Sequence, residues 1–390
     1  MPGDFDYALV GGGLQNGLIA LAVRAHQPDA RIAIIERAPA LAGNHTWCFH
    51  DSDLPPAMAA WLAPAITARW IGHDVAFPGH RRALAGGYAC VAAEDLATAV
   101  TAALDQPGSA LRTRTSAETI AADHVVVRNP DNTTETIRAS AVIAARGPDA
   151  AALDAATGWQ KFLGQEVRTT GPHGLVRPML MDATVPQVDG FRFVYVLPLA
   201  PDRLLIEDTY FSDSAHLDAA HLRGEIGRYA LAHGWPIAEV LREETGVLPL
   251  PWRMPDDLPA AAAPLVAGYA GGWFHPVTGY SFPIAARVAA HVAARPAADL
   301  HGADRGALDD LARQQRKQLG FALRLNWMLF RWFPPDQRYH VLERFYRLPE
   351  ATIRRFYALE LTAFDRARIL IGRPPRGMSW RAALALGEAR

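Results

Sequence analysis

Short apolar runs separated by glycine or polar residues make up the first forty residues of the chain. Residues 5–10, FDYALV, form an apolar run that ends in three glycines. Good helix formers with a helical apolar periodicity follow over residues 14–25, and a second apolar run, RIAIIER, occupies residues 31–37. A strand, a glycine turn, a helix and a second strand in this order predict the βαβ unit of a nucleotide-binding sheet.

A different pattern appears in mid-chain. Two β-rich runs within residues 191–211 flank a Pro-Asp pair at 201–202, which is typical of a β-hairpin. The hairpin lies far from the first βαβ unit, so it predicts an antiparallel sheet in an inserted substrate domain. Further elements are predicted outside it: a helix at residues 92–103, strands at 125–127 and 136–147, a glycine-rich turn and helix within 265–294, and a largely helical region at 305–390.

Composition excludes several classes of protein. Half of the 390 residues are hydrophobic and 20% are charged, which excludes general disorder. Two cysteines are too few for a disulfide scaffold, and no Cys/His cluster indicates a metal site. The first residues lack the features of a secretory signal, so we expect a cytoplasmic protein. The longest uncharged run, residues 258–286, is interrupted by four prolines and cannot be one membrane-spanning helix.

The net charge of −1 hides an asymmetry. Residues 311–376 contain 14 Lys/Arg and five Asp/Glu, a net charge of +9, so the remainder of the chain carries −10. Such a basic block favours an anionic partner. Residues 321–333 mix large apolar and aromatic side chains with Arg324 and Arg331, which predicts a helix lying on an anionic membrane surface with its aromatic side inserted. Alternatively, these apolar positions pack the helical region against the core. No motif indicates nucleic acid.

The glycine turn has the composition of a dinucleotide site. Gly11 and Gly13 stand where the backbone bends and where it must approach a pyrophosphate. The third glycine of the usual motif is replaced by Asn16. The predicted helix from Leu14 would offer its free N–H groups to the anion, and Glu36 closes the second strand, where a carboxylate binds the adenosine ribose. The acid favours FAD or NAD over NADP, and the later glycine turn favours FAD. A glycine triplet alone equally fits any flexible turn.

Segments in a consistent order along nearly the whole chain carry a further indication. They are GGGLQNGLIA (11–20), IIER (34–37), GNHTWCFH (43–50), FLGQEV (162–167), FRFVYVLPL (191–199), LLIEDTYF (204–211), FHPVTGYSFP (274–283) and FRWFPPDQRYHVLERFYRLP (330–349). Together they resemble the bacterial-type lycopene β-cyclases, FAD-dependent carotenoid cyclases. One departure is Ala144, where an acid is expected before Ala-Arg-Gly.

The resemblance implies an α/β fold. This is a Rossmann-like FAD-binding domain of the glutathione-reductase and aromatic-hydroxylase type, with an inserted antiparallel-sheet substrate domain and a helical C-terminal region. The expected boundaries are residues 1–158 for the first part of the FAD-binding domain, 159–255 for the substrate domain, 256–300 for the return segment and 301–390 for the basic, membrane-associating helical region.

The resemblance also implies a reaction without net redox change. Both acyclic ends of lycopene would close into β-rings, giving β-carotene through γ-carotene, and other acyclic or monocyclic carotenes would be related substrates. FAD is expected to work in its reduced form, with NADPH as the reductant. The protein is expected to be peripheral, at the cytoplasmic face of the bacterial inner membrane. Two alternatives remain open: a redox flavoprotein of the same fold, such as an isoprenoid reductase or hydroxylase, and a carotenoid-binding protein with a vestigial flavin fold.

The cyclisation chemistry requires an acid in an apolar pocket, because lycopene must be protonated on a terminal double bond. Glu207 follows the apolar run 204–206, and the family's essential glutamate in IEDT corresponds to it by the resemblance. Asp208 is included in the catalytic pair, either orienting Glu207 or binding the flavin, although strand alternation points it to the opposite face. Alternatively, one of the two pairs with an arginine at the hairpin edge.

The segment 276–281, PVTGYS, resembles the turn that lies near the flavin ring in such flavoproteins. Gly279 would allow close approach, and a helix from Pro283 would present its positive end. Gly268, Tyr269 and Ala270 replace the usual Gly-Asp pair that holds the ribityl chain. His45 is expected either near the flavin or facing solvent. The complete predicted cofactor set is Gly11, Gly12, Gly13, Leu14, Glu36, Arg37, His45, Pro276, Thr278, Gly279 and Tyr280.

Overall fold

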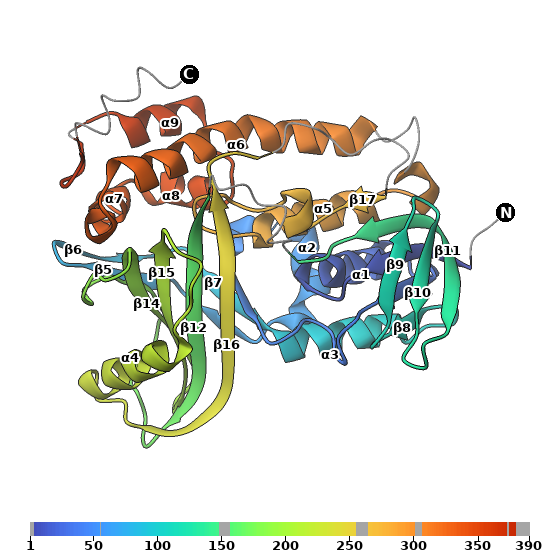
Figure 1. The fold of residues 1–390 in the computed structure, drawn as a ribbon, viewed down its shortest axis with the longest axis horizontal. Coiled ribbons are helices and arrows are strands. Elements are labelled where there is room, and N and C mark those ends of the chain that lie inside the picture. The colour runs from blue at the N-terminus through green and yellow to red at the C-terminus, as the bar shows by residue number, and fades with distance from the viewer. Residues whose placement is uncertain are drawn as a thin grey trace.

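A computed structural model describes residues 4–54, 56–147, 157–254, 264–300, 306–372 and 374–379. Within this part of the chain, the strands form two seven-stranded sheets and one three-stranded sheet, and helices of the C-terminal region cover one end of the molecule (Figure 1). The predicted α/β fold class is confirmed.

The first sheet contains the predicted βαβ unit. Its order is β8 (Ala110–Arg112), β2 (Ile32–Ile35), β1 (Phe5–Val10), β11 (Thr134–Ala144), β10 (His124–Arg128) and β9 (Ser116–Ile120), and β17 (Leu265–Val266) pairs with β11. The strands β8, β2, β1, β11 and β17 are parallel, whereas β10 and β9 are antiparallel to their neighbours. The helix α1 (Leu14–His26) is buried from Leu14 to Val23 because it lies against α3 (Ala93–Leu104) and α5 (Phe282–Ala293).

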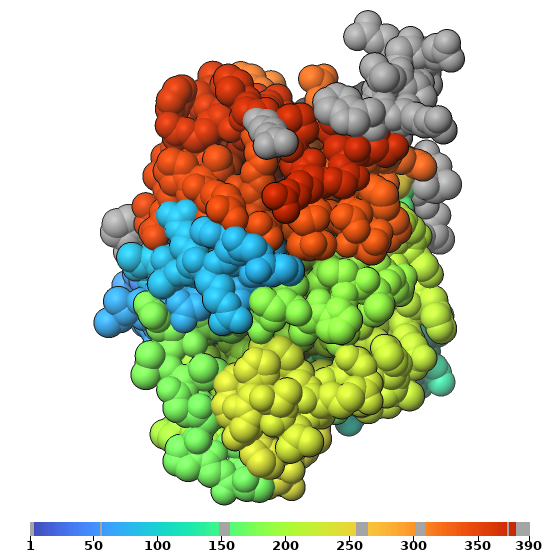
Figure 2. Space-filling view, turned by 90° about the vertical axis from the view of Figure 1, so that its left-hand side faces the viewer, coloured from blue at the N-terminus to red at the C-terminus, as the bar shows by residue number. Residues whose placement is uncertain are grey.

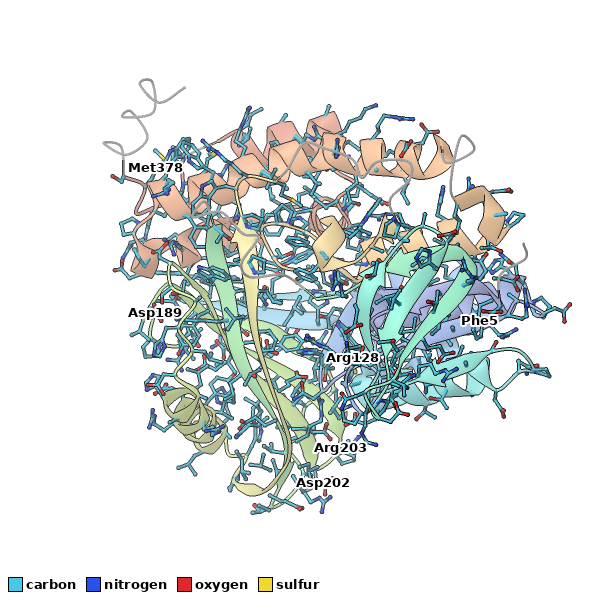
Figure 3. The ribbon with its side chains drawn as sticks, turned by 45° about the vertical axis from the view of Figure 1, so that its right-hand side comes forward. Phe5, Arg128, Asp189, Asp202, Arg203 and Met378 are labelled. Atoms are coloured by element: carbon cyan, nitrogen blue, oxygen red, sulfur yellow. The ribbon has the colours of Figure 1, made fainter. Side chains whose placement is uncertain are left out.

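The second sheet contains the predicted hairpin. Its order is β16 (Ile237–Pro251), β12 (Thr157–Thr169), β15 (Arg203–Ser212), β14 (Phe191–Ala200), β13 (Met179–Asp182), β5 (His73–Phe77) and β6 (His80–Leu84). The β14–β15 turn at Pro201 and Asp202 lies at the end of the sheet opposite the C-terminal helices, as the labels of Asp202 and Arg203 show (Figure 3). The strand β13 runs parallel to β5, whereas the other neighbouring pairs are antiparallel.

The strands β5 and β6 differ from the expected division of the chain. They precede residue 158 and were therefore expected in the first domain, but they extend the second sheet. The reason is the parallel pairing of Asp74 with Met179, a contact between segments about a hundred residues apart that no local pattern predicts. The three-stranded sheet has the order β3 (Thr46–His50), β7 (Tyr88–Ala92) and β4 (Ala68–Trp70), and Cys90 of β7 packs with Leu205 of the second sheet. The helix α2 (Pro56–Leu62) contacts α1.

The two faces of the second sheet have different coverings. The helix α4 (Ala219–Ala232) packs Leu222 and Ile226 onto Ile206 and the other even-numbered residues of β15. The odd-numbered residues face the other way, and Phe211 belongs to the same core as the first sheet. Strand alternation therefore places Glu207 and Asp208 on opposite faces.

The C-terminal region consists of α6 (Gly306–Trp332), α7 (Tyr339–Phe345), α8 (Glu350–Tyr357) and α9 (Ala363–Leu370). In Figure 2 these helices lie directly over the segment around β6, where Arg82 donates to the carbonyl oxygen of Tyr346 at 2.8 Å. The α6 residues Leu329 and Phe330 are buried in the core, so the packing alternative holds for this face of the helix. Among the described helices, none is long and apolar enough to cross a membrane.

Candidate functional site

A cavity of about 390 Å³ lies where the first sheet, the second sheet and the three-stranded sheet meet. Most of the side chains around it are apolar or aromatic. The first sheet and α1 contribute Gly13, Leu14, Gln15, Ala145, Arg146 and Gly147; the second sheet contributes Gln160, Phe162, Phe193, Tyr195, Glu207, Phe211 and Glu244. The β3 region contributes His45, Trp47 and Cys48, and the return segment contributes Thr278, Gly279 and Tyr280. Such a lining suits a hydrocarbon that meets a few polar groups.

The glycine turn opens onto this cavity. Gly11 has φ +98°, and a Cβ there would lie 2.6 Å from the carbonyl oxygen of Ala145, so only glycine fits. Gly13 is the N-cap of α1, and a Cβ there would meet no protein atom within 4 Å. The first turn of α1 has no acidic residue and no side-chain cap. Its free N–H groups can therefore bind an anion such as a pyrophosphate.

The side chains of Glu36 and Asn16 stabilise the glycine turn by hydrogen bonds to its backbone. The Gly12 N–H donates to Glu36 Oε2 at 2.6 Å, and the Ala38 N–H donates to Glu36 Oε1 at 2.7 Å. Asn16 Nδ2 donates to the carbonyl oxygens of Val10 and Gly11, at 3.0 and 2.8 Å. Asn16 therefore replaces the third glycine by tying the helix to the strand through hydrogen bonds.

The return segment places a second helix N-terminus at the cavity. Gly279 has φ +66°, and its carbonyl oxygen accepts a hydrogen bond from the hydroxyl of Tyr269, which stacks on Phe274 at 4.3 Å. The helix α5 begins immediately afterwards without a side-chain cap at Ser281. Gln15 Nε2 donates to the carbonyl oxygen of Ala285 at 3.1 Å and joins α1 to α5.

The predicted cofactor residues are only partly brought together. Gly13, Leu14, His45, Thr278, Gly279 and Tyr280 line the cavity. Gly11, Gly12 and Glu36 form the turn behind it. Pro276 is buried outside the lining, and Arg37 is exposed. His45 lies at the cavity, where burial and then the Arg242 charge lower its pKa. The residues that line the cavity or form the turn fit a dinucleotide with its pyrophosphate at α1.

Glu207 projects from β15 into the cavity. Its exposed surface faces this cavity, whose other walls are largely apolar. Burial, and then the charge of Glu244, raise the pKa of Glu207 to about 8, although Thr209 opposes this by donating to Glu207 Oε1 at 2.6 Å. The carboxyl group is therefore protonated at neutral pH and can act as a general acid.

Glu244, on β16, is a cavity residue that the sequence reasoning missed. Only 2% of its surface is exposed, and Arg242 Nη1 donates to its Oε2 at 3.0 Å. Burial raises its pKa to about 7, and Arg242 opposes this rise. In the sequence, residues 242–244, Arg-Glu-Glu, have the composition of a solvated charged run. Only the pairing of β16 with β12 shows that Glu244 faces the cavity.

Tyr195 and Cys48 were also missed. The Tyr195 hydroxyl donates to Cys48 Sγ at 2.7 Å and lies 3.1 Å from the hydroxyl of Tyr88. Burial raises the pKa of Tyr195 well above its ordinary value, so this polar cluster is uncharged. Cys48 and Tyr88 belong to the three-stranded sheet and Tyr195 belongs to the second sheet, and no sequence spacing connects the three residues.

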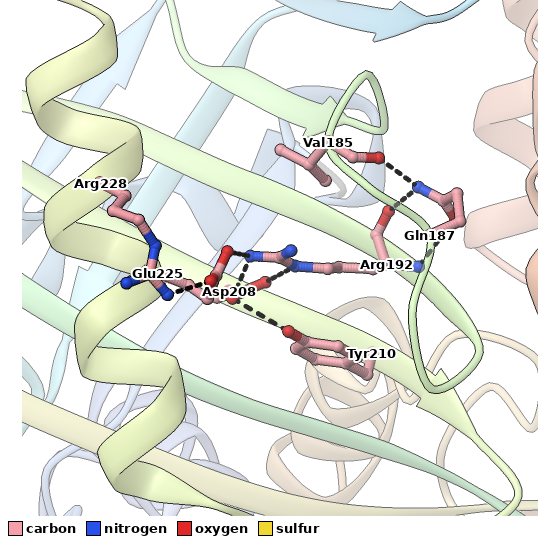
Figure 4. Close-up of polar contacts among 7 residues, drawn as sticks. All are labelled: Val185, Gln187, Arg192, Asp208, Tyr210, Glu225 and Arg228. Carbon is pink, nitrogen blue, oxygen red and sulfur yellow. Dashed lines mark hydrogen bonds and ion pairs between the residues drawn. The ribbon is translucent and has the colours of Figure 1, made fainter.

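The structure does not bring Asp208 to the cavity. Its carboxylate accepts two hydrogen bonds from Arg192, at 2.9 and 2.8 Å, on the face covered by α4 (Figure 4). Tyr210 donates to Asp208 Oδ2 at 3.2 Å, and Glu225 of α4 accepts from Arg192 at 2.7 Å. The expected catalytic placement of Asp208 is therefore corrected: strand alternation puts it behind the sheet in a buried ion pair.

Comparisons with known proteins identify a family and a fold. The family described as "Lycopene cyclase protein" matches residues 6–383. The lycopene beta-cyclase of Pantoea ananas is 44% identical over 375 residues, 95% of each chain. That of Pseudescherichia vulneris is 44% identical over 388 residues, 97% of each chain.

Solved structures share the fold at low sequence identity. A geranylgeranyl bacteriochlorophyll reductase-like protein from Thermoplasma acidophilum superposes with a TM-score of 0.63 and 14% identity, covering 98% of both chains. The p-nitrophenol 4-monooxygenase of Pseudomonas putida has a TM-score of 0.62 and 14% identity, covering 92% of this chain and 99% of its own. The fold is therefore that of flavoprotein reductases and monooxygenases.

The position of Asp208 leads to a stability prediction. Asp208→Asn should lower the free energy of unfolding by about 3 kcal/mol, because it leaves the buried Arg192 charge with Glu225 alone. Urea denaturation of the purified variant measures this loss. Glu207→Gln is the matched control and should show no such loss, since it removes no ion pair. An Asp208→Asn variant with unchanged stability would contradict the structural role.

Proposed function

Because the chain belongs to the lycopene cyclase family, we propose that it converts lycopene to β-carotene through γ-carotene by closing both acyclic ends into β-rings. Other acyclic or monocyclic carotenes are related substrates. The observation that carries the proposal is Glu207, a carboxyl group whose raised pKa keeps it protonated in a largely apolar cavity beside a dinucleotide turn.

The cavity supports each step of a cyclisation without net redox change. Glu207 donates its proton to a terminal double bond of the polyene, and the tertiary cation is captured by a nearby alkene. The faces of Phe162, Phe193 and Phe211, which line the cavity, stabilise positive charge. The ionised Glu207 then removes a proton from a ring carbon and returns to its starting state. The apolar lining excludes water, which would otherwise capture the cation.

We assign FAD to the dinucleotide turn. Gly13 and the N-terminus of α1 would hold the pyrophosphate, Glu36 the ribose, and Thr278, Gly279 and Tyr280 the region of the flavin ring. If FAD is bound there in reduced form, with NADPH as the reductant, it would contribute negative charge to the site without taking electrons from the substrate. The residues themselves contribute two helix N-termini directed at the cavity, which favour anions.

A redox flavoprotein is the alternative, because the fold is shared with reductases and monooxygenases. The alternative requires a reductant to be consumed in proportion to product. Cyclisation requires none, since product and substrate are isomers.

Glu207→Gln tests the proposed reaction. In a lycopene-accumulating bacterium, the wild-type chain should form γ-carotene and β-carotene, and Glu207→Gln should lower the cyclisation rate about a hundredfold or more because an amide cannot donate the proton. Chromatographic separation of the pigments measures both. Glu239→Gln, an exposed position on β16, which is separated from β15 by β12, is the control and should retain activity. Full cyclisation by Glu207→Gln, or NADPH use in proportion to product, would contradict the proposal.

Gly13→Ala tests the cofactor assignment. The added methyl group meets no protein atom within 4 Å, so the fold should be unchanged, but it would occupy space needed by the pyrophosphate. The purified variant should lose most of the yellow flavin absorbance of the wild type. Gly227→Ala, in α4, also meets no atom within 4 Å and should keep the flavin. Equal flavin content in both variants would contradict the assignment.

We further propose that α9, rather than the aromatic side of residues 321–333, contacts an anionic lipid surface, at the cytoplasmic face of the inner membrane. Phe364 and Ile371 are 67% and 72% exposed. Arg368 lies 4.3 Å from the Phe364 ring, and Arg344 donates to the carbonyl oxygen of Ile371 at 2.7 Å. Exposed apolar side chains beside arginines are typical of peripheral binding to anionic bilayers.

The double variant Phe364→Asp, Ile371→Asp should reduce binding to vesicles containing phosphatidylglycerol at least tenfold, because it removes the inserted side chains and adds negative charge. Cosedimentation with the vesicles measures the bound fraction. Leu231→Asp changes a side chain of similar exposure, 68%, on α4, and should bind normally. Equal binding by all three proteins would contradict this surface.

A further inference from the structure

Two carboxyl groups lie in one row across the second sheet. The central strand β12 places Gly164 opposite Glu207 of β15 on one side and opposite Glu244 of β16 on the other. Residues directly opposite each other on neighbouring strands point to the same face. Tyr195 of β14 continues the row, because it pairs with Glu207. Glu244, Glu207 and Tyr195 all line the cavity.

Gly164 leaves the space between the two carboxyl groups open. A Cβ at this position would lie 3.1 Å from Glu244 Cγ, 3.3 Å from Glu244 Oε1 and 3.4 Å from Glu207 Cβ. The Glu244 side chain therefore lies over the glycine, and Glu207 Cβ borders the same space. A larger residue at 164 would occupy the space across which the two groups face each other.

Arg242 holds the charge of Glu244. Its Nη1 donates to Glu244 Oε2 at 3.0 Å, and its Nη2 donates to Thr46 Oγ1 at 2.7 Å. Its Nε lies 3.3 Å from Glu166 Oε2, and the carbonyl oxygen of Asn44 accepts a further hydrogen bond. With these partners the guanidinium is fixed at Glu244 Oε2, so it favours the ionised form of Glu244.

We propose that Glu244 is a positioning residue for Glu207: its negative charge, fixed by Arg242 and brought close across Gly164, holds the transferable proton on Glu207. Because Arg242 donates to Glu244 and not to Glu207, Glu244 is the member of the pair that carries the negative charge. Glu207 gives its proton to the terminal alkene carbon and recovers one from a ring carbon, so the pair ends each cycle as it began. This inference rests on the proposed function.

The other charged or titratable groups near the pair do not supply a negative charge to Glu207 in place of Glu244. Tyr195 faces Glu207 from β14, and burial raises its pKa well above the ordinary value, so it stays uncharged. Asp208 lies on the other face of β15 with Arg192. Arg242 binds Glu244, and Glu166 and His45 interact with Arg242.

Glu244→Gln tests the inference through the pH dependence of Glu207. The variant removes a negative charge and leaves Arg242 positive, and both changes favour ionised Glu207. The alkaline limb of the turnover profile should therefore move to lower pH by about one unit or more, with about a tenfold loss of rate above that limb. Glu244→Asp keeps the charge and should shift the limb less.

A second readout does not depend on turnover. The carboxylic-acid C=O infrared band that disappears in Glu207→Gln reports the protonated Glu207 directly. The pH midpoint of this band should fall in Glu244→Gln by the same amount as the kinetic limb. Flavin content and urea denaturation show whether each variant is folded. If Glu244→Gln does not fold, Glu244→Asp is used for the test.

Glu243→Gln is the matched control. Glu243 is the adjacent residue of β16 but binds Arg223 and Gln165 instead, at 2.7 and 2.9 Å, so its loss should leave the limb and the band unchanged. An unshifted limb and band in folded Glu244→Gln would overturn the inference. So would a shift of a full unit or more in Glu244→Asp, because that variant keeps the negative charge. A wild type that makes no cyclic carotene would overturn the proposed function instead, while the infrared titration would still decide the role of Glu244.

Discussion

Keeping a carboxyl group out of water, beside a second carboxyl group, is the constraint on which the site depends. Burial disfavours the charged form of each group, and close approach makes double ionisation costlier still. The second sheet meets this constraint by placing Glu207 and Glu244 on either side of Gly164 and by fixing Arg242 beside only one of them. This asymmetry favours the proton on Glu207 and the negative charge on Glu244. A carboxyl group can therefore keep its proton inside a largely apolar cavity, where a hydrocarbon substrate has no polar group of its own to bind it.

The strand β15 carries the proposed acid on one face and a stabilising ion pair on the other. Along β15, Glu207 faces the cavity, and Asp208 faces α4 in an ion pair with Arg192. Burying the Arg192 charge without partners would cost free energy of folding. Its partners are Asp208, Glu225 and the ring of Tyr210. Because neighbouring residues of a strand point in opposite directions, the acid can be desolvated on one face while the other face anchors the helix.

The first sheet contributes a complementary environment. An isoprenoid hydrocarbon requires apolar walls, whereas a dinucleotide requires donors for its phosphates. The N-termini of α1 and α5 supply such donors to the cavity, and the aromatic residues of the second sheet supply apolar walls. The C-terminal helices close this arrangement, and Asn326 of α6 donates to the carbonyl oxygens of Leu250 and Pro251 at the end of β16.

Local patterns in the sequence determined the βαβ unit, the β14–β15 hairpin and the separation of Glu207 from Asp208, because apolar periodicity and turn residues act over a few positions. Tertiary structure alone decided that β5 and β6 join the second sheet, that Leu329 and Phe330 of α6 point inward, and that Glu244 stands beside Glu207. Each of these depends on which distant strand or helix becomes a neighbour. Strand register across a sheet is a long-range property, and a charged run such as 242–244 carries no local sign of the face it will occupy.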